Sequence, residues 1–194
     1  MVYKVSVVIG VHGFNVKDPS KTVGKLKAKV KDLVVFDYGW IGLFGALFGN
    51  KGIAKDLKRL IDSNAGKKHI VYSHSNGSAI SVKASELGAD IHTLVCINSA
   101  LKVKTKFPDS IKRIIVVYTR NDKATKAADF LDRVPLLQLI IPNAWGAMGA
   151  YGYKGDDKRV INCNLTDKLD GHSDFFSSDN IDVLVPYLKG IIDK

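Results

Sequence analysis

The sequence has little of several features that define large classes of proteins. Its 194 residues include only two cysteines, Cys96 and Cys163, and each lies inside an apolar run. Two such residues argue against a disulfide framework and favour buried thiols in a reducing compartment. No His, Cys, Asp or Glu residues have the spacing of a metal site. No apolar run reaches the roughly 18 residues of a membrane span, and no signal peptide is visible, so we expect a cytoplasmic protein.

Glycine-rich loops that hold phosphate groups are also absent. The segment Gly10–Phe14, after the first apolar run, has two glycines but matches neither G-x-G-x-x-G nor G-x-x-x-x-G-K-[ST]. This argues against a nucleotide-binding domain, and we expect no cofactor. No motif of a nucleic-acid-binding fold is present, so we expect no nucleic-acid partner either.

Positive charge is in excess. The chain has 29 Lys and Arg against 19 Asp and Glu, a formal net charge of +10. The lysines are densest over residues 21–31, where Val23, Leu26 and Val30 are interleaved with them as in a helix that packs on one face. We interpret this segment as a solvated helix face. An acidic partner or peripheral contact with a lipid surface is the alternative.

Short apolar runs recur along the chain, with helical patterns between them. The runs are residues 5–11, 33–36, 69–72, 91–97, 114–118 and 160–163. They are continuous rather than alternating, as expected for parallel strands buried on both faces. Apolar residues at helical spacing occur between them, for example over 53–61, and again over 184–192. We therefore predict an α/β fold, a three-layer, doubly wound, mostly parallel sheet of about six strands with helices on both faces.

Domain organisation follows from length and composition. A chain of 194 residues fits one domain better than two. No stretch rich in Pro, Gly or Ser divides it. We expect a single domain over residues 1–194 without a separate cap.

The segment SHSNG at residues 73–77 carries the strongest functional signal. It lies between a strand-like run, 69–72, and a helical run, 77–87. A nucleophilic serine needs a sharp strand-to-helix turn, and small residues two before and two after it relieve the crowding. The segment matches this G-x-S-x-G pattern with Ser73 in place of the first glycine. We predict that Ser75 is a nucleophile, with a serine that only caps the helix as the alternative.

A His-Gly-Phe triplet, residues 12–14, follows the first strand-like run. A tetrahedral intermediate needs two backbone N–H donors aimed at its oxyanion. In enzymes with this serine turn, one donor belongs to the residue after the nucleophile, and the other lies in a loop after an earlier strand. We therefore predict that the N–H groups of Phe14 and Asn76 form an oxyanion hole, with His12 in a supporting position.

Two polar residues late in the chain complete a catalytic set. Asp122 follows the run 114–118, and His172 lies in a polar loop after the last run. The order serine, acid, histidine is the expected one, and a carboxylate on the far imidazole nitrogen would fix the histidine tautomer. We predict a triad of Ser75, Asp122 and His172. Asp37 is the rival acid because it also ends a strand.

These motifs together resemble the α/β-hydrolase superfamily over essentially the whole chain, and its length is similar to that of the small, lid-poor esterases and lipases. The resemblance implies the strand order 2-1-3-4-5-6, with Ser75 at the switch point of the sheet. It also implies a serine hydrolase that cleaves carboxylic esters or related acyl compounds through an acyl-Ser75 intermediate, without metal or cofactor. Thioester, amide or acyl-transfer chemistry would use the same residues. The alternative is a non-catalytic protein that binds a ligand or partner on the same fold, which the departure at Ser73 favours.

Two apolar, glycine-rich segments follow strand-like runs, where loops surround the site of an α/β protein. They are GWIGLFGALFGN at residues 39–50 and NAWGAMGAYGYKG at residues 143–155. We interpret them as walls for an acyl or aromatic group, with tight loop packing as the alternative. The predicted substrate pocket, for a small acyl ester, consists of His12, Trp40, Phe44, Trp145 and Met148.

Overall fold

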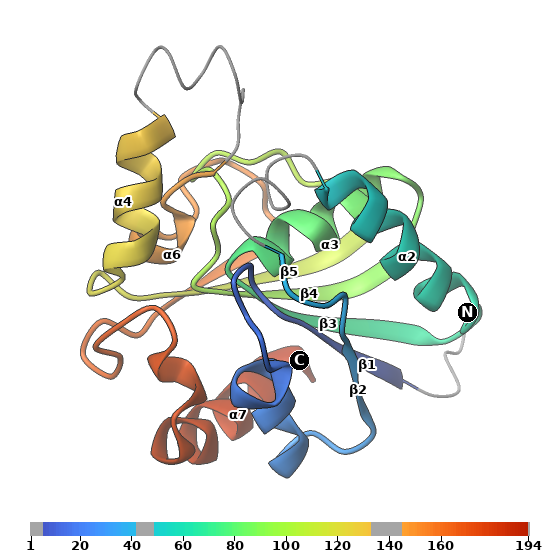
Figure 1. Ribbon diagram of the computed structural model, residues 1–194, viewed down its shortest axis with the longest axis horizontal. Helices are drawn as coiled ribbons and strands as arrows, with labels where there is room; N and C mark the ends of the chain where they lie inside the picture. Colours follow the sequence, from blue (N-terminus) through green and yellow to red (C-terminus); the bar gives the residue numbers. More distant parts are fainter. Residues whose placement is uncertain (1–5, 42–48, 133–144, 194) are drawn as a thin grey trace.

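The computed structural model describes residues 6–41, 49–132 and 145–193. Its centre is a sheet of six parallel strands in the order β2-β1-β3-β4-β5-β6, which confirms the predicted order (Figure 1). Each predicted run falls on one strand. The strands are β1 (Ser6–Val11), β2 (Leu33–Phe36), β3 (Lys68–His74), β4 (Ile91–Ile97), β5 (Ile111–Tyr118) and β6 (Val160–Asn164).

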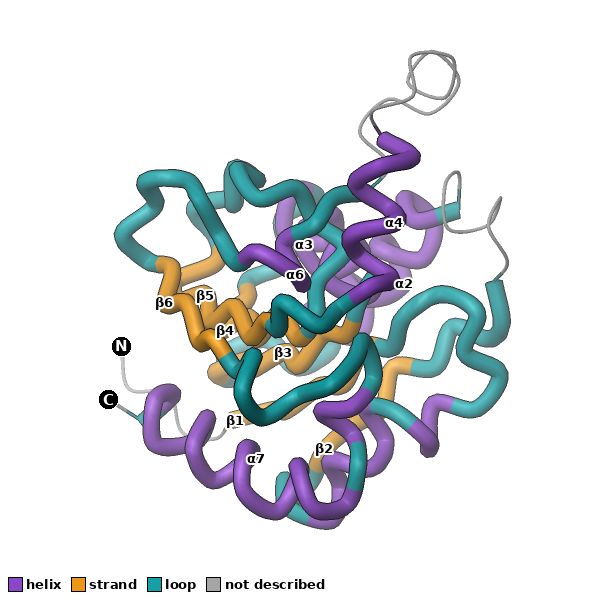
Figure 2. The backbone as a smooth tube through the Cα atoms, turned by 90° about the vertical axis from the view of Figure 1, so that its left-hand side faces the viewer, coloured by secondary structure: helices purple, strands orange, loops and turns teal. Residues whose placement is uncertain are grey.

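Helices cover both faces of this sheet, as predicted. Figure 1 shows α2 (Asn50–Asp62) and α3 (Asn76–Glu86) on one face and α7 (Ser178–Ile192) on the other, and Figure 2 shows the strands between them. The face with α7 also holds the short 3-10 helices η2 (Val23–Ala28) and η3 (Asp174–Phe176). The remaining helices in the described ranges are η1 (Pro19–Lys21), α4 (Lys123–Asp132) and α6 (Met148–Tyr151), and the last two pack together after β5.

Two apolar layers hold the sheet between the helices. Leu57 of α2 and Ile80 of α3 are buried in one layer, and Leu184 and Leu188 of α7 are buried in the other. The strands contribute to both layers because their alternating side chains point to opposite faces. Both cysteines are buried and free, as expected from their apolar surroundings.

The lysine-rich segment differs in part from its prediction. Residues 21–31 form parts of η1 and η2 rather than one regular helix, because most of their hydrogen bonds join residues three apart, as from Lys25 N–H to the Thr22 carbonyl (2.9 Å). The predicted division into faces is nevertheless correct. The apolar residues Val23, Leu26 and Val30 are buried, and the lysines around them are exposed. In the part of the chain that the structure describes, no helix has the length and apolar character needed to cross a bilayer.

Candidate active site

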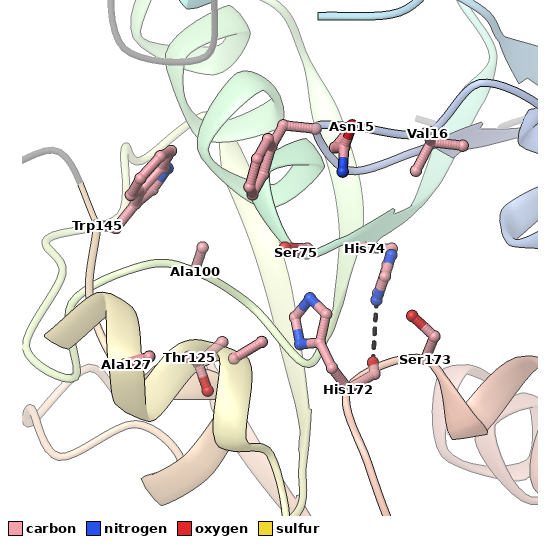
Figure 3. A pocket seen from close by; sticks show the side chains of 12 residues that line it. Asn15, Val16, His74, Ser75, Ala100, Thr125, Ala127, Trp145, His172 and Ser173 are labelled. Atoms are coloured by element: carbon pink, nitrogen blue, oxygen red, sulfur yellow. Dashed lines mark hydrogen bonds between the residues drawn. The ribbon is translucent and has the colours of Figure 1, made fainter. Parts of the chain in front are cut away.

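Ser75 forms the whole connection between β3 and α3. Its backbone has φ 52° and ψ −121°, a conformation that a residue with a Cβ rarely adopts. The Ser75 N–H donates to the Ile97 carbonyl of β4 (3.1 Å), which ties the turn to the sheet. The helix begins at Asn76, so the Ser75 side chain projects from the carboxyl edge of the strands (Figure 3). This is the sharp turn that the sequence predicts for a nucleophilic serine.

The small residues two positions before and two positions after Ser75, Ser73 and Gly77, are required for two different physical reasons. A Cβ on Gly77 would lie 2.5 Å from the carbonyl oxygen of His12, so glycine allows α3 to approach the end of β1. Ser73, in contrast, is buried and hydrogen-bonded. Its hydroxyl donates to the Val95 carbonyl (3.0 Å) and lies 3.0 Å from the Ser78 hydroxyl. The departure from the glycine pattern therefore supplies hydrogen bonds between two strands and a helix.

Asp122 and His172 form a hydrogen-bonded pair at the same edge. The Oδ2 atom of Asp122 lies 2.8 Å from Nδ1 of His172, and Oδ1 accepts the N–H of Thr125 at 3.0 Å. Complete burial raises the pKa of Asp122, but the hydrogen bonds from His172 and Thr125 outweigh it, so the net pKa lies below the ordinary value. An ionised Asp122 can only accept a hydrogen bond, so Nδ1 of His172 carries the proton and donates that hydrogen bond to the carboxylate. The other ring nitrogen, Nε2, is then the basic one.

The rival acid, Asp37, is in a different environment. Its side chain is 58% exposed, and its Oδ1 lies 3.6 Å from Nε2 of His12 and accepts the Gly39 N–H at 2.9 Å. The carboxylate that contacts His172 is therefore that of Asp122.

Helix α6 packs directly against Asp122. A Cβ on Gly149 would lie 2.7 Å from Oδ2 of Asp122 and 2.6 Å from the backbone of Asn98. The Gly149 N–H donates to the Ser99 carbonyl (2.7 Å), and its carbonyl accepts the Thr119 N–H (3.0 Å). In this part of the second glycine-rich segment, the glycine thus allows close packing around Asp122, which is the alternative that the sequence left open.

Two side chains from neighbouring strand ends hold the loop that carries His172. The carbonyl oxygen of His172 lies 2.7 Å from Nδ2 of Asn98, which donates to it, and 3.0 Å from Nε2 of His74 (Figure 3). The imidazole rings of His74 and His172 are 4.8 Å apart. Sequence reasoning gave neither residue a role. The available signal was position, because His74 directly precedes Ser75 and Asn98 directly follows β4.

The buried position of His74 has a consequence for the pH dependence of stability. Burial, together with the neighbouring His172, lowers the pKa of His74 from 6.5 to about 3. Below pH 6.5 the unfolded chain therefore takes up a proton at this residue that the folded chain does not bind until about pH 3. The free energy of unfolding should fall as the pH falls through this range, by about 1.4 kcal/mol per pH unit for one such group.

The variant His74→Gln should reduce this slope in urea denaturation series run between about pH 7 and about pH 5. A residual slope should remain, because burial also lowers the pKa values of His12 and His69. Equal slopes for the wild type and the variant would show that His74 is protonated in the folded protein over this range.

A cavity of about 450 Å³ lies in front of Ser75 and His172, and both residues line it (Figure 3). No hydrogen bond joins the Ser75 hydroxyl to His172 in this structure. Catalytic hydrogen bonds of this kind are often long without substrate and tighten in the complex. Half of the twelve residues that line the cavity are apolar. These residues are Phe14, Val16, Ala100, Ala124, Ala127 and Trp145.

The loop of residues 12–14 is fixed beside the start of α3. The Tyr38 hydroxyl lies 2.8 Å from each of the first two carbonyl oxygens of this loop, and the Tyr38 ring stacks on that of His12 at 3.8 Å. Burial raises the pKa of Tyr38, so the phenol stays protonated and remains a donor. Among the residues that the structure describes, no backbone acceptor is found for the N–H of Phe14 or of Asn76. Phe14 lines the cavity, whereas Asn76 is completely buried and is not part of its wall.

Trp145 is the predicted pocket residue that the structure places on the cavity wall. Its ring stacks on Phe14, with ring centroids 5.3 Å apart, and its Nε1 donates to Oδ1 of Asn76 at 3.3 Å. It therefore contacts both residues whose N–H groups were predicted to form the oxyanion hole. Trp145 thus braces that part of the cavity as well as lining it.

Three other predicted pocket residues are absent from the wall of this cavity. His12 and Met148 are completely buried and do not line the cavity, since the first stacks on Tyr38 and the second belongs to the apolar core. Trp40 is 57% exposed, outside the cavity wall. Phe44 lies outside the described residues. Within residues 6–41, 49–132 and 145–193, no group of three or more His, Cys, Asp or Glu side chains could hold a metal ion.

The fold and the residues at the carboxyl edge of the sheet define a class of protein. Its members have a doubly wound parallel α/β sheet with a serine turn after β3. No family model matches the chain, and no curated protein matches it. Solved structures do match. Mouse alpha/beta hydrolase domain-containing protein 10 aligns with a TM-score of 0.61 and 14% identity. The alignment covers 100% of this chain and 92% of the mouse chain. The lipase BlEst2 of Bacillus licheniformis aligns with a TM-score of 0.55 and 13% identity over 95% and 91%.

A third similar structure is TT1662 from Thermus thermophilus, which has a TM-score of 0.58 and 10% identity over 97% of this chain and 89% of its own. These alignments extend over nearly the whole length of each protein. Together with the strand order, they show that the chain has the fold of the α/β-hydrolase superfamily.

Proposed function

We propose that this protein is a serine hydrolase that cleaves carboxylic esters or related acyl compounds through an acyl-Ser75 intermediate. The observation that carries the proposal is that Ser75, on its strained turn, and His172 line the same cavity (Figure 3). The buried carboxylate of Asp122 contacts the ring of His172. Ser75, Asp122 and His172 follow three different strands. Their convergence is therefore a property of the fold rather than of a local sequence.

In the proposed acylation step, each of these groups has a distinct role. The Ser75 hydroxyl attacks the acyl carbon while Nε2 of His172 accepts its proton. The Asp122 carboxylate holds the other ring nitrogen and stabilises the imidazolium that forms. The N–H groups of Phe14 and Asn76 donate to the oxygen that gains negative charge. His172 then gives the proton to the leaving alcohol, and the same groups activate a water molecule that hydrolyses acyl-Ser75.

The cavity wall supports an acyl or aromatic group next to the reacting carbon. Its volume of about 450 Å³ is in the range of small-molecule sites. Three of its apolar residues, Ala100, Ala124 and Ala127, have small side chains that leave room for the ligand. The names of similar structures, one of them a lipase, agree with this substrate class.

A fluorophosphonate probe tests the proposal directly. The wild-type protein should be labelled, and peptide mapping should find the label on Ser75. The variant Ser75→Ala should lose the label while it stays folded by circular dichroism. Ser73→Ala is the matched control and should keep the label, because the Ser73 hydroxyl is buried and bonded to Val95.

The opposite outcome is equally informative. A folded wild-type protein that neither takes the label nor hydrolyses p-nitrophenyl esters contradicts the proposal. Binding of a ligand or partner without catalysis would then become the leading function.

A further inference from the structure

A second cavity, of about 540 Å³, adjoins the catalytic one. Ala100 and Trp145 line both cavities, so the two are neighbours that share these residues as part of their walls. Figure 3 shows both residues on one side of Ser75. The second cavity differs in charge, since four lysines and one glutamate line it. We call it the lysine groove, and these residues are Lys83, Lys102, Lys104, Lys106 and Glu86.

The charge of the lysine groove is not balanced by its own acidic residue. Glu86 pairs with Lys83, with an N–O distance of 2.7 Å. Lys104 and Lys106 are exposed, and neither has an ion-pair partner among the described residues. The groove therefore offers positive charge to a ligand beyond what the protein neutralises.

Three of these lysines, Lys102, Lys104 and Lys106, lie on a segment that is fixed to Ser75. The Ala100 N–H donates to the Ser75 carbonyl (3.3 Å), and the Ala100 carbonyl accepts the Gly146 N–H (2.7 Å). Farther along, the Thr105 N–H donates to the Lys102 carbonyl (3.0 Å) and closes a turn. Lys104 follows Ala100 by four residues, so its Cα lies at most about 14 Å from that of Ala100. A substrate of ordinary metabolite size can reach both places.

We propose that the lysine groove binds an anionic group, a carboxylate or a phosphate, on the same substrate whose acyl carbon is attacked by Ser75. The inference rests on the proposed hydrolase function and adds a substrate class to it. The apolar cavity would hold the part beside the scissile bond, and the lysines would hold the charged end as point charges. A lipid surface is the weaker choice, because the lysines line a concave site that adjoins the catalytic cavity.

Matched pairs of esters test which end of the substrate carries the charge. On the acyl side, p-nitrophenyl hydrogen glutarate is compared with p-nitrophenyl pentanoate. On the alcohol side, para-acetoxybenzoate is compared with its methyl ester. In at least one pair, the ratio of kcat/KM values, charged over neutral, should be about fivefold higher in the wild type than in Lys104→Gln/Lys106→Gln. This difference should shrink at high salt.

A second double variant distinguishes the effect of a local anion site from the effect of the protein's net charge. Lys25→Gln/Lys27→Gln removes the same charge from η2, on the opposite face of the sheet. It should leave the charged-to-neutral ratio at the wild-type value. An equal loss in both double variants would mean that net charge alone sets the preference, which overturns the groove.

Binding gives a measurement that does not need turnover. Ser75→Ala protein, with and without the Lys104 and Lys106 changes, is titrated calorimetrically with phenyl phosphate and benzoate, and with phenol as the neutral compound. Anion binding that the lysine changes abolish supports the groove even if no ester is cleaved, and in that case only the hydrolase proposal fails. Ser75-dependent hydrolysis with an unchanged ratio and no anion binding overturns the groove alone. So does lysine-dependent binding to phosphatidylserine vesicles with an unchanged ratio, which assigns these lysines to a lipid surface.

Discussion

Replacement of Ser75 by alanine should lower kcat for a p-nitrophenyl ester by about 10⁴-fold or more. The variant lacks the oxygen that would form the acyl intermediate, and the other serine that lines the cavity, Ser173, has an ordinary backbone with φ −111°. The pair of Asp122 and His172 stays intact, so any remaining rate should reflect binding and polarisation of the ester by Phe14 and Asn76. Steady-state kinetics with a burst-phase assay measure the loss. A Ser75→Ala enzyme that keeps more than about one hundredth of the wild-type rate would exclude Ser75 as the nucleophile.

A glycine at the same position should remove activity but relieve backbone strain and so raise stability relative to alanine. Ser75 has a positive φ of 52°, which glycine adopts without steric conflict. Ser75→Gly should therefore be as inactive as Ser75→Ala but more stable than it, by up to about 1 kcal/mol in the free energy of unfolding from urea denaturation. A glycine variant less stable than the alanine variant would show that the turn holds no strain.

The sheet could be predicted from sequence because its strands are buried on both faces. Runs such as 91–97 and 114–118 are apolar at nearly every position, a pattern that few other elements share. Helices α2 and α7 followed from the spacing of their apolar residues. The lysine-rich segment has the same spacing, but its bonds between residues three apart make it a 3-10 helix. Apolar spacing reports which side is buried, and it does not fix the hydrogen-bond pattern.

Residues at the carboxyl edge of the sheet were predicted with uneven success, for a physical reason. Parallel strands bring their carboxyl ends together, so polar residues at those ends, such as Asp122, could be named from the sequence. The direction of a side chain beyond the strand end depends on loop geometry. Apolar type alone therefore could not tell that Met148 points into the core and Trp145 toward the cavity. The contacts of Asn98 with the loop of His172 join segments more than seventy residues apart, and no local pattern encodes them.

Asp122→Asn should lower kcat by about 10³-fold to 10⁴-fold with little change in KM. The asparagine amide keeps the shape of the side chain but has no charge to stabilise the imidazolium of His172. An amide oriented to donate its N–H would also favour the tautomer with its proton on Nε2, which cannot accept the proton of Ser75. Because Asp122 is completely buried and its Oδ2 lies 2.8 Å from His172 Nδ1, solvent cannot replace the lost interaction.

Asp37→Asn is the control for this substitution, since it makes the same chemical change at the rival acid. That side chain is 58% exposed and contacts His12 rather than His172, so kcat should stay within about twofold of the wild type. Fluorophosphonate labelling rates should follow the same order, slow in Asp122→Asn and near normal in Asp37→Asn. If the Asp37 variant lost activity and the Asp122 variant kept it, the acid would come from the end of β2 and His172 would have to move on substrate binding. A loss of kcat in Asp122→Asn alone would instead show that the activity depends on the carboxylate of Asp122. This is the carboxylate that contacts His172 and packs against Gly149 of α6.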